Sequence, residues 1–130
     1  MSHTLSVRVY YEDTDFAGIV YYANYLKFIE RGRTEMLRAA GVDQSRLKAE
    51  RGLVFVVSRV AIDYRAPARF DDLLTVETRI DRLGRAALEM RQDVLRDGDL
   101  LVTALVRLAC IGDDGRPVRL PAELAARLSE

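Results

Sequence analysis

The amino-acid sequence predicts an α+β domain in which a five-stranded antiparallel β-sheet wraps around one long central helix. Two observations lead to this fold class: one long segment has the spacing of an amphipathic helix, and five segments have the character of β-strands. No repeat, linker or low-complexity stretch separates these segments, so residues 1–130 are expected to form a single domain. A chain of this length can bury its own core.

The N-terminal third contains the first expected strand and the long helix. Ser6–Glu12 alternates apolar and polar side chains, which predicts a strand. Residues 13–22 are then rich in the turn-forming types Asp, Thr and Gly. From Asn24 to Ala40 apolar residues recur every three or four positions, which predicts a one-sided helix with Asn24 as its N-cap and Gly41 at its end.

The remaining chain predicts one short helix, four strands and a last helix. The short helix is expected over Asp43–Arg51. The strands are expected over Leu53–Tyr64, Leu73–Leu83, Ala86–Arg96 and Leu100–Ile111. Asp97-Gly98 favours a tight hairpin between the last two strands, because both central positions of such a turn need positive φ. Pro121 opens the last helix, Ala122–Leu128.

Composition excludes several classes of partner. Lys plus Arg and Asp plus Glu number 20 each, so no excess positive charge is available to attract nucleic acid. No uninterrupted apolar run is long enough to cross a bilayer, and Met1–Tyr10 lacks the apolar centre of a signal peptide. The single cysteine, Cys110, lies in an apolar run and is expected to fill the core. A cytoplasmic protein is therefore expected.

The scarcity of histidine narrows the chemistry to carboxylates. His3 is the only histidine and is expected in a frayed N-terminus, which argues against Ser-His-Asp and Cys-His enzymes. No phosphate-binding glycine loop or clustered metal ligands occur, so neither a cofactor nor a metal is expected. Glu12, Asp13 and Asp15 lie just before the helix, whose first N–H groups lack intrahelical acceptors. A lone aspartate in such a loop is by itself more often a turn or capping residue than a catalyst.

A long motif at these residues changes that balance. It consists of Arg8-Val9-Tyr10-Tyr11-Glu12-Asp13-Thr14-Asp15, then Gly18-Ile19-Val20-Tyr21-Tyr22-Ala23-Asn24-Tyr25, then Glu30-Arg31-Gly32-Arg33-Thr34-Glu35-Met36-Leu37, with a weaker echo in Tyr64-Arg65-Ala66-Pro67-Ala68-Arg69 and Asp71-Asp72. Over nearly its whole length the chain resembles the 4-hydroxybenzoyl-CoA thioesterase family, which has the hotdog fold. It is most similar to the branch of acyl-CoA thioesterases associated with the bacterial Tol-Pal system.

The resemblance implies a site at the start of the helix. Asp15 matches the catalytic aspartate of the family, and Asp13 matches a supporting position. The backbone N–H of Tyr22 matches the group that polarises the thioester carbonyl, although the Tol-Pal branch often has histidine there. Thr14 and Gly18 are expected to hold the loop. A second lineage of the family uses a catalytic glutamate on the central helix. Glu30 and Glu35 are the candidates for that role, and both rank below Asp15.

The resemblance also implies a substrate and an assembly. The substrate is a short-chain or aromatic acyl-CoA, and Arg85, with Arg82 as a second choice, is a candidate for binding the CoA phosphates; an ordinary exposed arginine is the alternative. Edge-to-edge pairing predicts a homodimer or homotetramer, and the Tol-Pal likeness allows a peripheral association with an envelope complex. The rival function is a noncatalytic acyl-CoA or acyl-carrier binding module linked to envelope organisation. A hotdog dehydratase would need a catalytic histidine.

Overall fold

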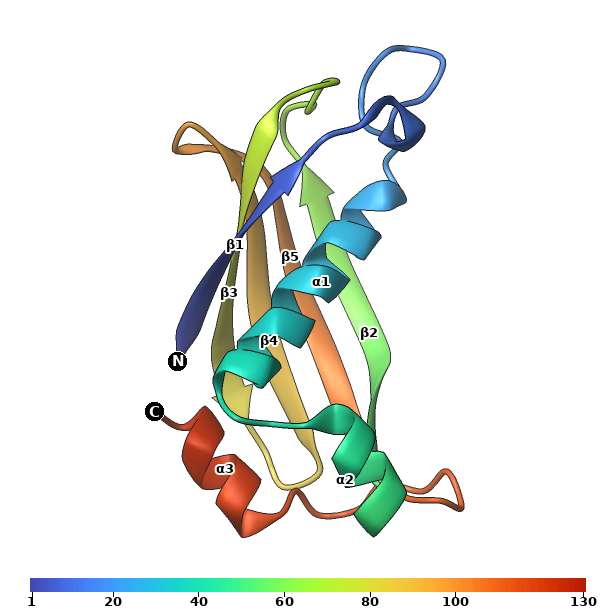
Figure 1. The fold of residues 1–130 in the computed structure, drawn as a ribbon, viewed down its shortest axis with the longest axis vertical. Helices are drawn as coiled ribbons and strands as arrows, with labels where there is room; N and C mark the ends of the chain where they lie inside the picture. The colour runs from blue at the N-terminus through green and yellow to red at the C-terminus, as the bar shows by residue number, and fades with distance from the viewer.

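The computed structural model describes residues 1–130, and it has the predicted architecture of one sheet and one long helix (Figure 1). Its elements in chain order are β1 (Ser2–Arg8), the 3-10 helix η1 (Tyr11–Asp13), α1 (Asn24–Ala39), α2 (Gln44–Arg51), β2 (Val54–Tyr64), β3 (Leu73–Leu83), β4 (Ala87–Arg96), β5 (Asp99–Ile111) and α3 (Ala122–Leu128). No helix combines the length and the apolar character needed to cross a bilayer.

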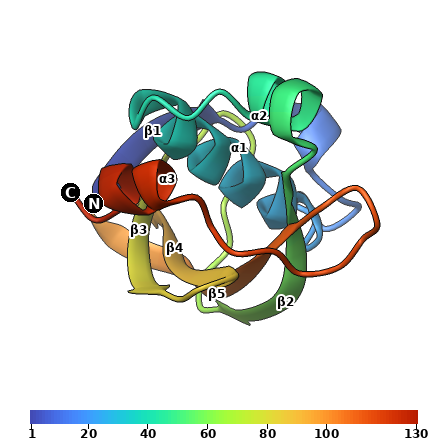
Figure 2. The same ribbon diagram turned by 90° about the horizontal axis from the view of Figure 1, so that it is seen from below.

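The five strands form one antiparallel sheet in the order β1-β3-β4-β5-β2. Viewed along its strands in Figure 2, the sheet curves around α1, which confirms the predicted α+β arrangement. The first and second strands of the sequence, β1 and β2, are its two edges. The 11-residue strand β2 therefore has one side with no neighbouring strand.

The first strand differs from its prediction. β1 begins at Ser2 and ends at Arg8, whereas the alternating pattern placed it over Ser6–Glu12. His3 is not frayed, because it pairs with Thr78 of β3. The strand ends early because the side chain of Asp13 accepts a hydrogen bond from the N–H of Tyr10 at 2.8 Å, which closes a 3-10 turn.

The central helix matches its predicted length to within one residue, but the N-cap prediction for Asn24 is wrong. Ala23 precedes the helix and already has helical dihedrals, so Asn24 is the first helical residue. Its side-chain Nδ2 donates to the carbonyl of Asp13 at 2.9 Å instead of capping an N–H group. Gly41, with φ of +82°, follows the helix as predicted.

The other elements begin within one residue of their predicted starts and end where predicted. Asp97 and Gly98 both have positive φ, +51° and +84°, which confirms the tight hairpin between β4 and β5. Asp43 caps α2 by accepting from the N–H of Arg46. Pro121 stands at the N-cap of α3.

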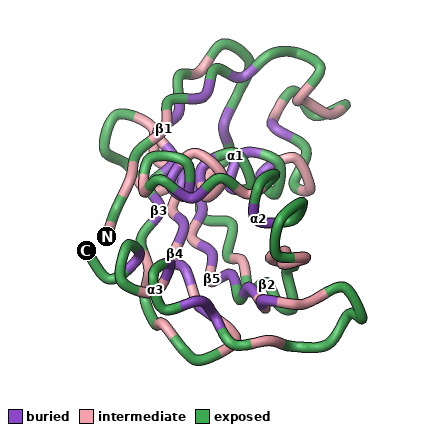
Figure 3. Tube along the Cα trace, turned by 60° about the horizontal axis from the view of Figure 1, so that its bottom comes forward, coloured by how far each residue is buried: buried purple, intermediate pink, exposed green.

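The core lies between α1 and the concave face of the sheet (Figure 3). Phe28, Ile29 and Met36 of the helix are fully buried there, and Cys110 fills the same core as predicted. Gly32 lies so close to the sheet that a Cβ atom would stand 2.7 Å from a methyl group of Val76. Beside it, the buried Gln92 side chain of β4 donates to the carbonyl of Ile29 at 2.7 Å. The helix is therefore fixed along the sheet by a close approach and a hydrogen bond.

Candidate active site

The predicted catalytic segment forms a tight loop between β1 and α1, at the end of the molecule where β2 also ends (Figure 1). Asp15 and Ile19 face each other, with the N–H of Asp15 donating to the carbonyl of Ile19 at 2.9 Å. Thr14 and Val20 form an isolated β-bridge, and Gly18 makes the turn with φ of +80°. The loop is thus a small hairpin. Asp15 lies on its first arm, and its second arm leads to the start of α1.

The side chain of Asp15 is partly exposed, and only one of its two carboxylate oxygens accepts a hydrogen bond from the protein. Its Oδ1 accepts a hydrogen bond from the N–H of Ala17 at 2.9 Å, and no protein group donates to Oδ2. The neighbouring Tyr22 side chain is the main cause that raises the pKa of Tyr21, and the charge of Asp15 adds to it. Burial chiefly raises the pKa of Tyr25, and Asp15 again contributes. The charge of Asp15 therefore acts on the tyrosines at the helix start.

Tyr22 contributes an unused backbone donor. It lies between the loop and the first helical residue, and its N–H donates to no protein acceptor. The preceding N–H, that of Tyr21, is already paired with the carbonyl of Asp13 at 2.9 Å. Such a free donor at the positive end of a helix suits an anion or a developing negative charge.

Asp13, Thr14 and Asn24 stabilise the loop and the start of the helix through hydrogen bonds. The Asp13 carbonyl accepts from both Tyr21 N–H and Asn24 Nδ2, so it ties the loop to the first turn of the helix. Thr14 Oγ1 donates to the carbonyl of Tyr11 at 2.9 Å and closes the 3-10 turn. The three side chains thus form structural hydrogen bonds.

A second segment, residues 66–72, supports the loop from behind. The N–H of Val20 donates to the carbonyl of Ala68, and the N–H of Ala68 donates to the hydroxyl of Tyr25 at 3.0 Å. Asp72 Oδ2 accepts from the N–H of Arg69 and from the Arg96 guanidinium, each at 2.8 Å. Sequence reasoning missed Tyr25 because its partner lies 43 residues away and leaves no local signal.

The single chain leaves the candidate site open. Neither Asp15 nor Tyr22 lines any of the five principal cavities. Phe16, at the tip of the loop, is fully exposed, and Tyr22 is 60% exposed. Exposed large aromatic side chains are a common feature of binding and interaction surfaces.

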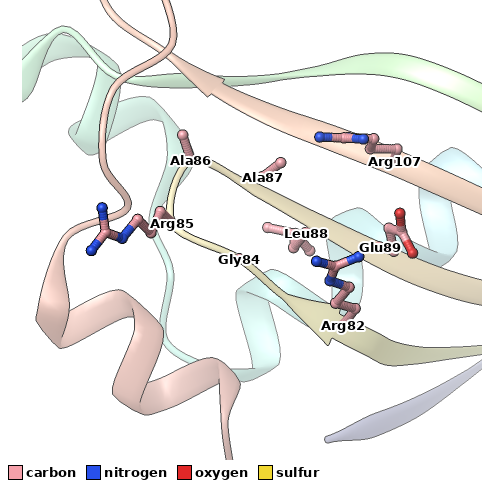
Figure 4. Close-up of a pocket in the computed structure, with 8 residues that line it drawn as sticks. All are labelled: Arg82, Gly84, Arg85, Ala86, Ala87, Leu88, Glu89 and Arg107. Carbon is pink, nitrogen blue, oxygen red and sulfur yellow. The ribbon is translucent and has the colours of Figure 1, made fainter.

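The arginines predicted to bind phosphate lie elsewhere, around the β3–β4 hairpin (Figure 4). Arg82 and Arg85 line the same cavity of about 320 Å³, together with Arg107 of β5. Arg82 and Arg107 flank Glu89 on the outer sheet face, whereas the Arg85 guanidinium is turned toward the segment that leads to α3. None of the three arginines forms an ion pair. Arg107 was missed because in the sequence it reads only as an interruption of an apolar strand.

The two helical glutamates have ordinary surface partners. Glu30 accepts a hydrogen bond from Thr34 at 3.0 Å, and Glu35 pairs with Arg38. No group of three or more His, Cys, Asp or Glu side chains is placed to hold a metal ion. The geometry around α1 thus favours the Asp15 loop over the helix as the place for acid-base or nucleophilic chemistry.

Replacing Asp72 by Asn tests the support behind the loop. Burial alone would raise the pKa of Asp72, but the Arg69 N–H and the Arg96 guanidinium more than offset it and hold this pKa below its usual range. The ionised carboxylate therefore stabilises the fold above about pH 4, and this stabilisation is lost as the pH falls through the lowered pKa. We expect Asp72→Asn to lower the free energy of unfolding by about 1 to 2 kcal/mol at pH 7.

Urea denaturation of both proteins at pH 7 and at successively lower pH provides the measurement. The difference between wild type and variant should shrink as the pH falls below 4, because Asp72 becomes protonated in both the folded and unfolded wild type. A difference that is constant across this range would contradict the role given to the charge of Asp72.

Comparison with known proteins agrees with this geometry. The family model described as the thioesterase-like superfamily matches residues 9–128. The acyl-CoA thioesterase YbgC of Haemophilus influenzae is 47% identical over 122 residues, which cover 92% of this chain and 89% of that protein. Both the matched length and the identity are high enough to establish common ancestry.

Solved structures agree in fold. The structure of a probable thioesterase from Bartonella henselae superposes with a TM-score of 0.89 at 45% identity, covering 93% of this chain and all of that one. An aspartate-to-asparagine variant of 4-hydroxybenzoyl-CoA thioesterase, bound to 4-hydroxybenzoyl-CoA, superposes with a TM-score of 0.93 at 26% identity and 98% coverage of both chains. The chain therefore belongs to the thioesterase-like superfamily and has its hotdog fold.

Proposed function

We propose that this protein is an acyl-CoA thioesterase, which hydrolyses the thioester of a short-chain or aromatic acyl-CoA to the free acid and CoA. The observation that carries the proposal is that one short segment, held by hairpin bonds, contains two polar groups without a partner in the chain. These are the free Oδ2 of Asp15 and the free N–H of Tyr22 at the start of α1. The activity named for the Haemophilus influenzae relative supports it.

The Tyr22 N–H has the chemistry needed to polarise the thioester. As the carbonyl carbon is attacked, negative charge develops on its oxygen, and a preorganised N–H donor at a helix start stabilises that charge. The loss of one such donor typically raises the barrier by about 3 to 4 kcal/mol. Nothing in the single chain competes for this N–H.

Asp15 has two possible tasks. As a nucleophile, its carboxylate forms a bond to the thioester carbon and the C–S bond breaks, which gives a mixed anhydride and CoA thiolate; water then cleaves the anhydride. As a general base, it takes a proton from the water that attacks the thioester, and the CoA thiolate leaves with the bond pair of electrons. An ordinary aspartate is a weak base for water at neutral pH, so a raised pKa in an enclosed site would favour the second route.

Asp15→Asn should retain the fold and lose nearly all thioesterase activity, because the amide is neither a carboxylate nucleophile nor a base. A hydrolysis panel of butyryl-, 4-hydroxybenzoyl- and palmitoyl-CoA, read as thiol release, measures both the activity and the acyl preference. Asp43→Asn is the matched control, since Asp43 caps α2 far from the loop. Substantial activity in the Asp15 variant would refute the assignment, and an inactive wild type would favour the noncatalytic binding module.

Single turnover in oxygen-18 water separates the two tasks of Asp15. Label recovered in the Asp15 carboxylate requires that water attacked the anhydride at the enzyme's own acyl carbon, so it would establish the nucleophilic route. General-base catalysis places the label in the released acid alone. Attack of water on the substrate's acyl carbon of the anhydride does the same, so label in Asp15 is the decisive outcome.

The arginines at the β3–β4 hairpin supply cations for the CoA phosphates. Arg82, Arg85 and Arg107 form no ion pair, and guanidinium groups bind phosphate oxygens well. Within one chain, however, this hairpin and the Asp15 loop lie at opposite ends of the sheet. β3 spans 11 residues, or roughly 35 Å, between them.

An antiparallel pairing of two β2 edges resolves this separation. A twofold axis across β2 brings the arginine end of one chain beside the Asp15 end of the other, and it covers the open side of the sheet. The exposed Phe16 and Tyr22 then lie near the interface. The proposal is thus a homodimer, or a tetramer built from such dimers, in which each substrate contacts both chains.

Arg85→Ala should raise KM for acyl-CoA by about tenfold with little effect on kcat, because lost phosphate contacts weaken ground-state and transition-state binding alike. The same acyl group on N-acetylcysteamine, which carries no phosphate, should show no such change. Arg82→Ala is expected to behave similarly but more weakly. Arg46→Ala, an exposed arginine on α2 paired only with Glu50, is the control. An equal effect on both thioesters would contradict phosphate binding.

Mixing Asp15→Asn with Arg85→Ala chains tests whether the site is shared. If Arg85 serves the partner's Asp15, a heterodimer contains one site with both residues intact, and a fraction of the activity returns with the wild-type KM. If both residues serve the same chain, no intact site forms, and KM stays as high as in the arginine variant. Differently tagged chains, refolded together and purified as heterodimers, allow the measurement.

The location was predicted from the composition, and the wider partners were predicted from the resemblance. The cytoplasm and a peripheral association with an envelope complex stay predictions, as does the acyl-carrier alternative. No helix of the chain is both long enough and apolar enough to span a membrane. A dehydratase function is disfavoured because His3, the single histidine, lies in the β1 edge strand, away from the Asp15 loop.

A further inference from the structure

The backbone of Tyr22 is held by different parts of the chain on its two sides. On the N-terminal side, Tyr21 N–H is fixed by the Asp13 carbonyl. On the C-terminal side, the carbonyl of Tyr22 accepts no backbone N–H, because the nearby Leu26 N–H is bonded to the Ala23 carbonyl instead. The only protein donor to the Tyr22 carbonyl is the hydroxyl of Tyr64, at 2.9 Å. One side-chain hydroxyl thus fixes the peptide unit that follows the free N–H.

Tyr64 is held in this position by strand pairing and by two aromatic neighbours. It is the last residue of β2, so its backbone is held in the sheet by pairing with Val102 of β5. Its ring meets the Tyr22 ring edge-on, with centroids 6.2 Å apart, and lies 5.7 Å from the Tyr25 ring. A hydroxyl held by a rigid strand and two aromatic neighbours is a well-placed donor.

The hydroxyl also remains a donor throughout the useful pH range. Burial is the main cause that raises the pKa of Tyr64, and the neighbouring Tyr22 and Tyr25 add to it. The phenol therefore stays protonated at neutral and mildly alkaline pH. Its hydrogen bond to the Tyr22 carbonyl does not depend on pH in that range.

We propose that Tyr64 is a positioning residue for hydrolysis, whose hydroxyl holds the Tyr22 peptide so that the preceding N–H is aimed at the thioester carbonyl oxygen. This inference rests on the proposed function, in which that N–H polarises the carbonyl. It adds a residue from the edge strand to the site. Because β2 is the strand at the proposed interface, Tyr64 also connects the pairing edge directly to the polarising group.

The Tyr64→Phe variant distinguishes a role of Tyr64 in packing from a role in positioning the Tyr22 N–H. Tyr64→Phe keeps the ring and its contacts with Tyr22 and Tyr25 but removes the hydroxyl, leaving the Tyr22 carbonyl without a protein donor. If Tyr64 only fills space, this variant changes unfolding stability slightly and kinetics not at all. If it positions the donor, transition-state stabilisation weakens while substrate binding persists.

Tyr64→Phe should lower kcat by about tenfold or more and leave KM within about twofold, because a small displacement of an oxyanion donor acts on the transition state. The assay uses whichever acyl-CoA of the panel the wild type hydrolyses fastest. Tyr11→Phe is the matched control: its hydroxyl forms no hydrogen bond and it is 80% exposed. A kcat within twofold of wild type would overturn the inference.

A spectroscopic measurement separates positioning from a general loss of structure. In the Asp15→Asn background, substrate labelled with carbon-13 at the thioester carbonyl should show a C=O stretch lowered by the N–H hydrogen bond. Adding Tyr64→Phe should move this stretch back toward its value in water. An unchanged stretch would overturn the inference even if kcat had fallen. A wild type that hydrolyses no acyl-CoA would instead remove the proposed function itself.

Discussion

The packing of α1 against the concave sheet determines where the helix start of the candidate site lies. Gly32 allows the helix to approach until no Cβ would fit, and Gln92 binds the Ile29 carbonyl at the same level. These two contacts stop the helix from sliding along the sheet. With the helix fixed, its first turn and the free N–H of Tyr22 are fixed at the end of the sheet where β2 also ends.

The loop that carries Asp15 is positioned by backbone groups more than by side-chain packing. Its hairpin bonds pair Asp15 with Ile19 and Asp13 with Tyr21, and Val20 bonds the Ala68 carbonyl behind it. Backbone bonds of this kind have few alternative geometries, since each donor has one acceptor in reach. The loop can therefore be exposed and still present its carboxylate in one place. This explains how a nearly solvent-facing segment can serve as the precise part of a site.

Most of the fold could be predicted from the sequence, because the strands and the long helix each have a regular local spacing of apolar residues. Alternation and helical spacing located α1, β3 and α3 almost to the residue. The end of β1 was misplaced because the alternation continues past Arg8, whereas the Tyr10 N–H donates a hydrogen bond to the Asp13 side chain and ends the strand. Asn24 was wrongly predicted to be the N-cap of α1, because asparagine is a common N-cap residue. Its side chain instead donates a hydrogen bond to the carbonyl of Asp13. Tyr64 and Tyr25 were missed as supports, because their partners are more than 40 residues away and no spacing rule reports them.

Three features of the single chain are incomplete in ways that one assembly would complete. β2 has a free edge, the Asp15 loop exposes Phe16 and lines none of the main cavities, and Arg82, Arg85 and Arg107 form no ion pair. In the proposed homodimer, an isologous pairing through β2 would place the second and third features side by side, because antiparallel strands bring opposite ends together. Tyr64 lies at the end of that same strand and bonds the Tyr22 carbonyl. In the proposed dimer, the strand that forms the interface would therefore also support the polarising N–H, and the Tyr64 bond that gives this support is already present in the single chain.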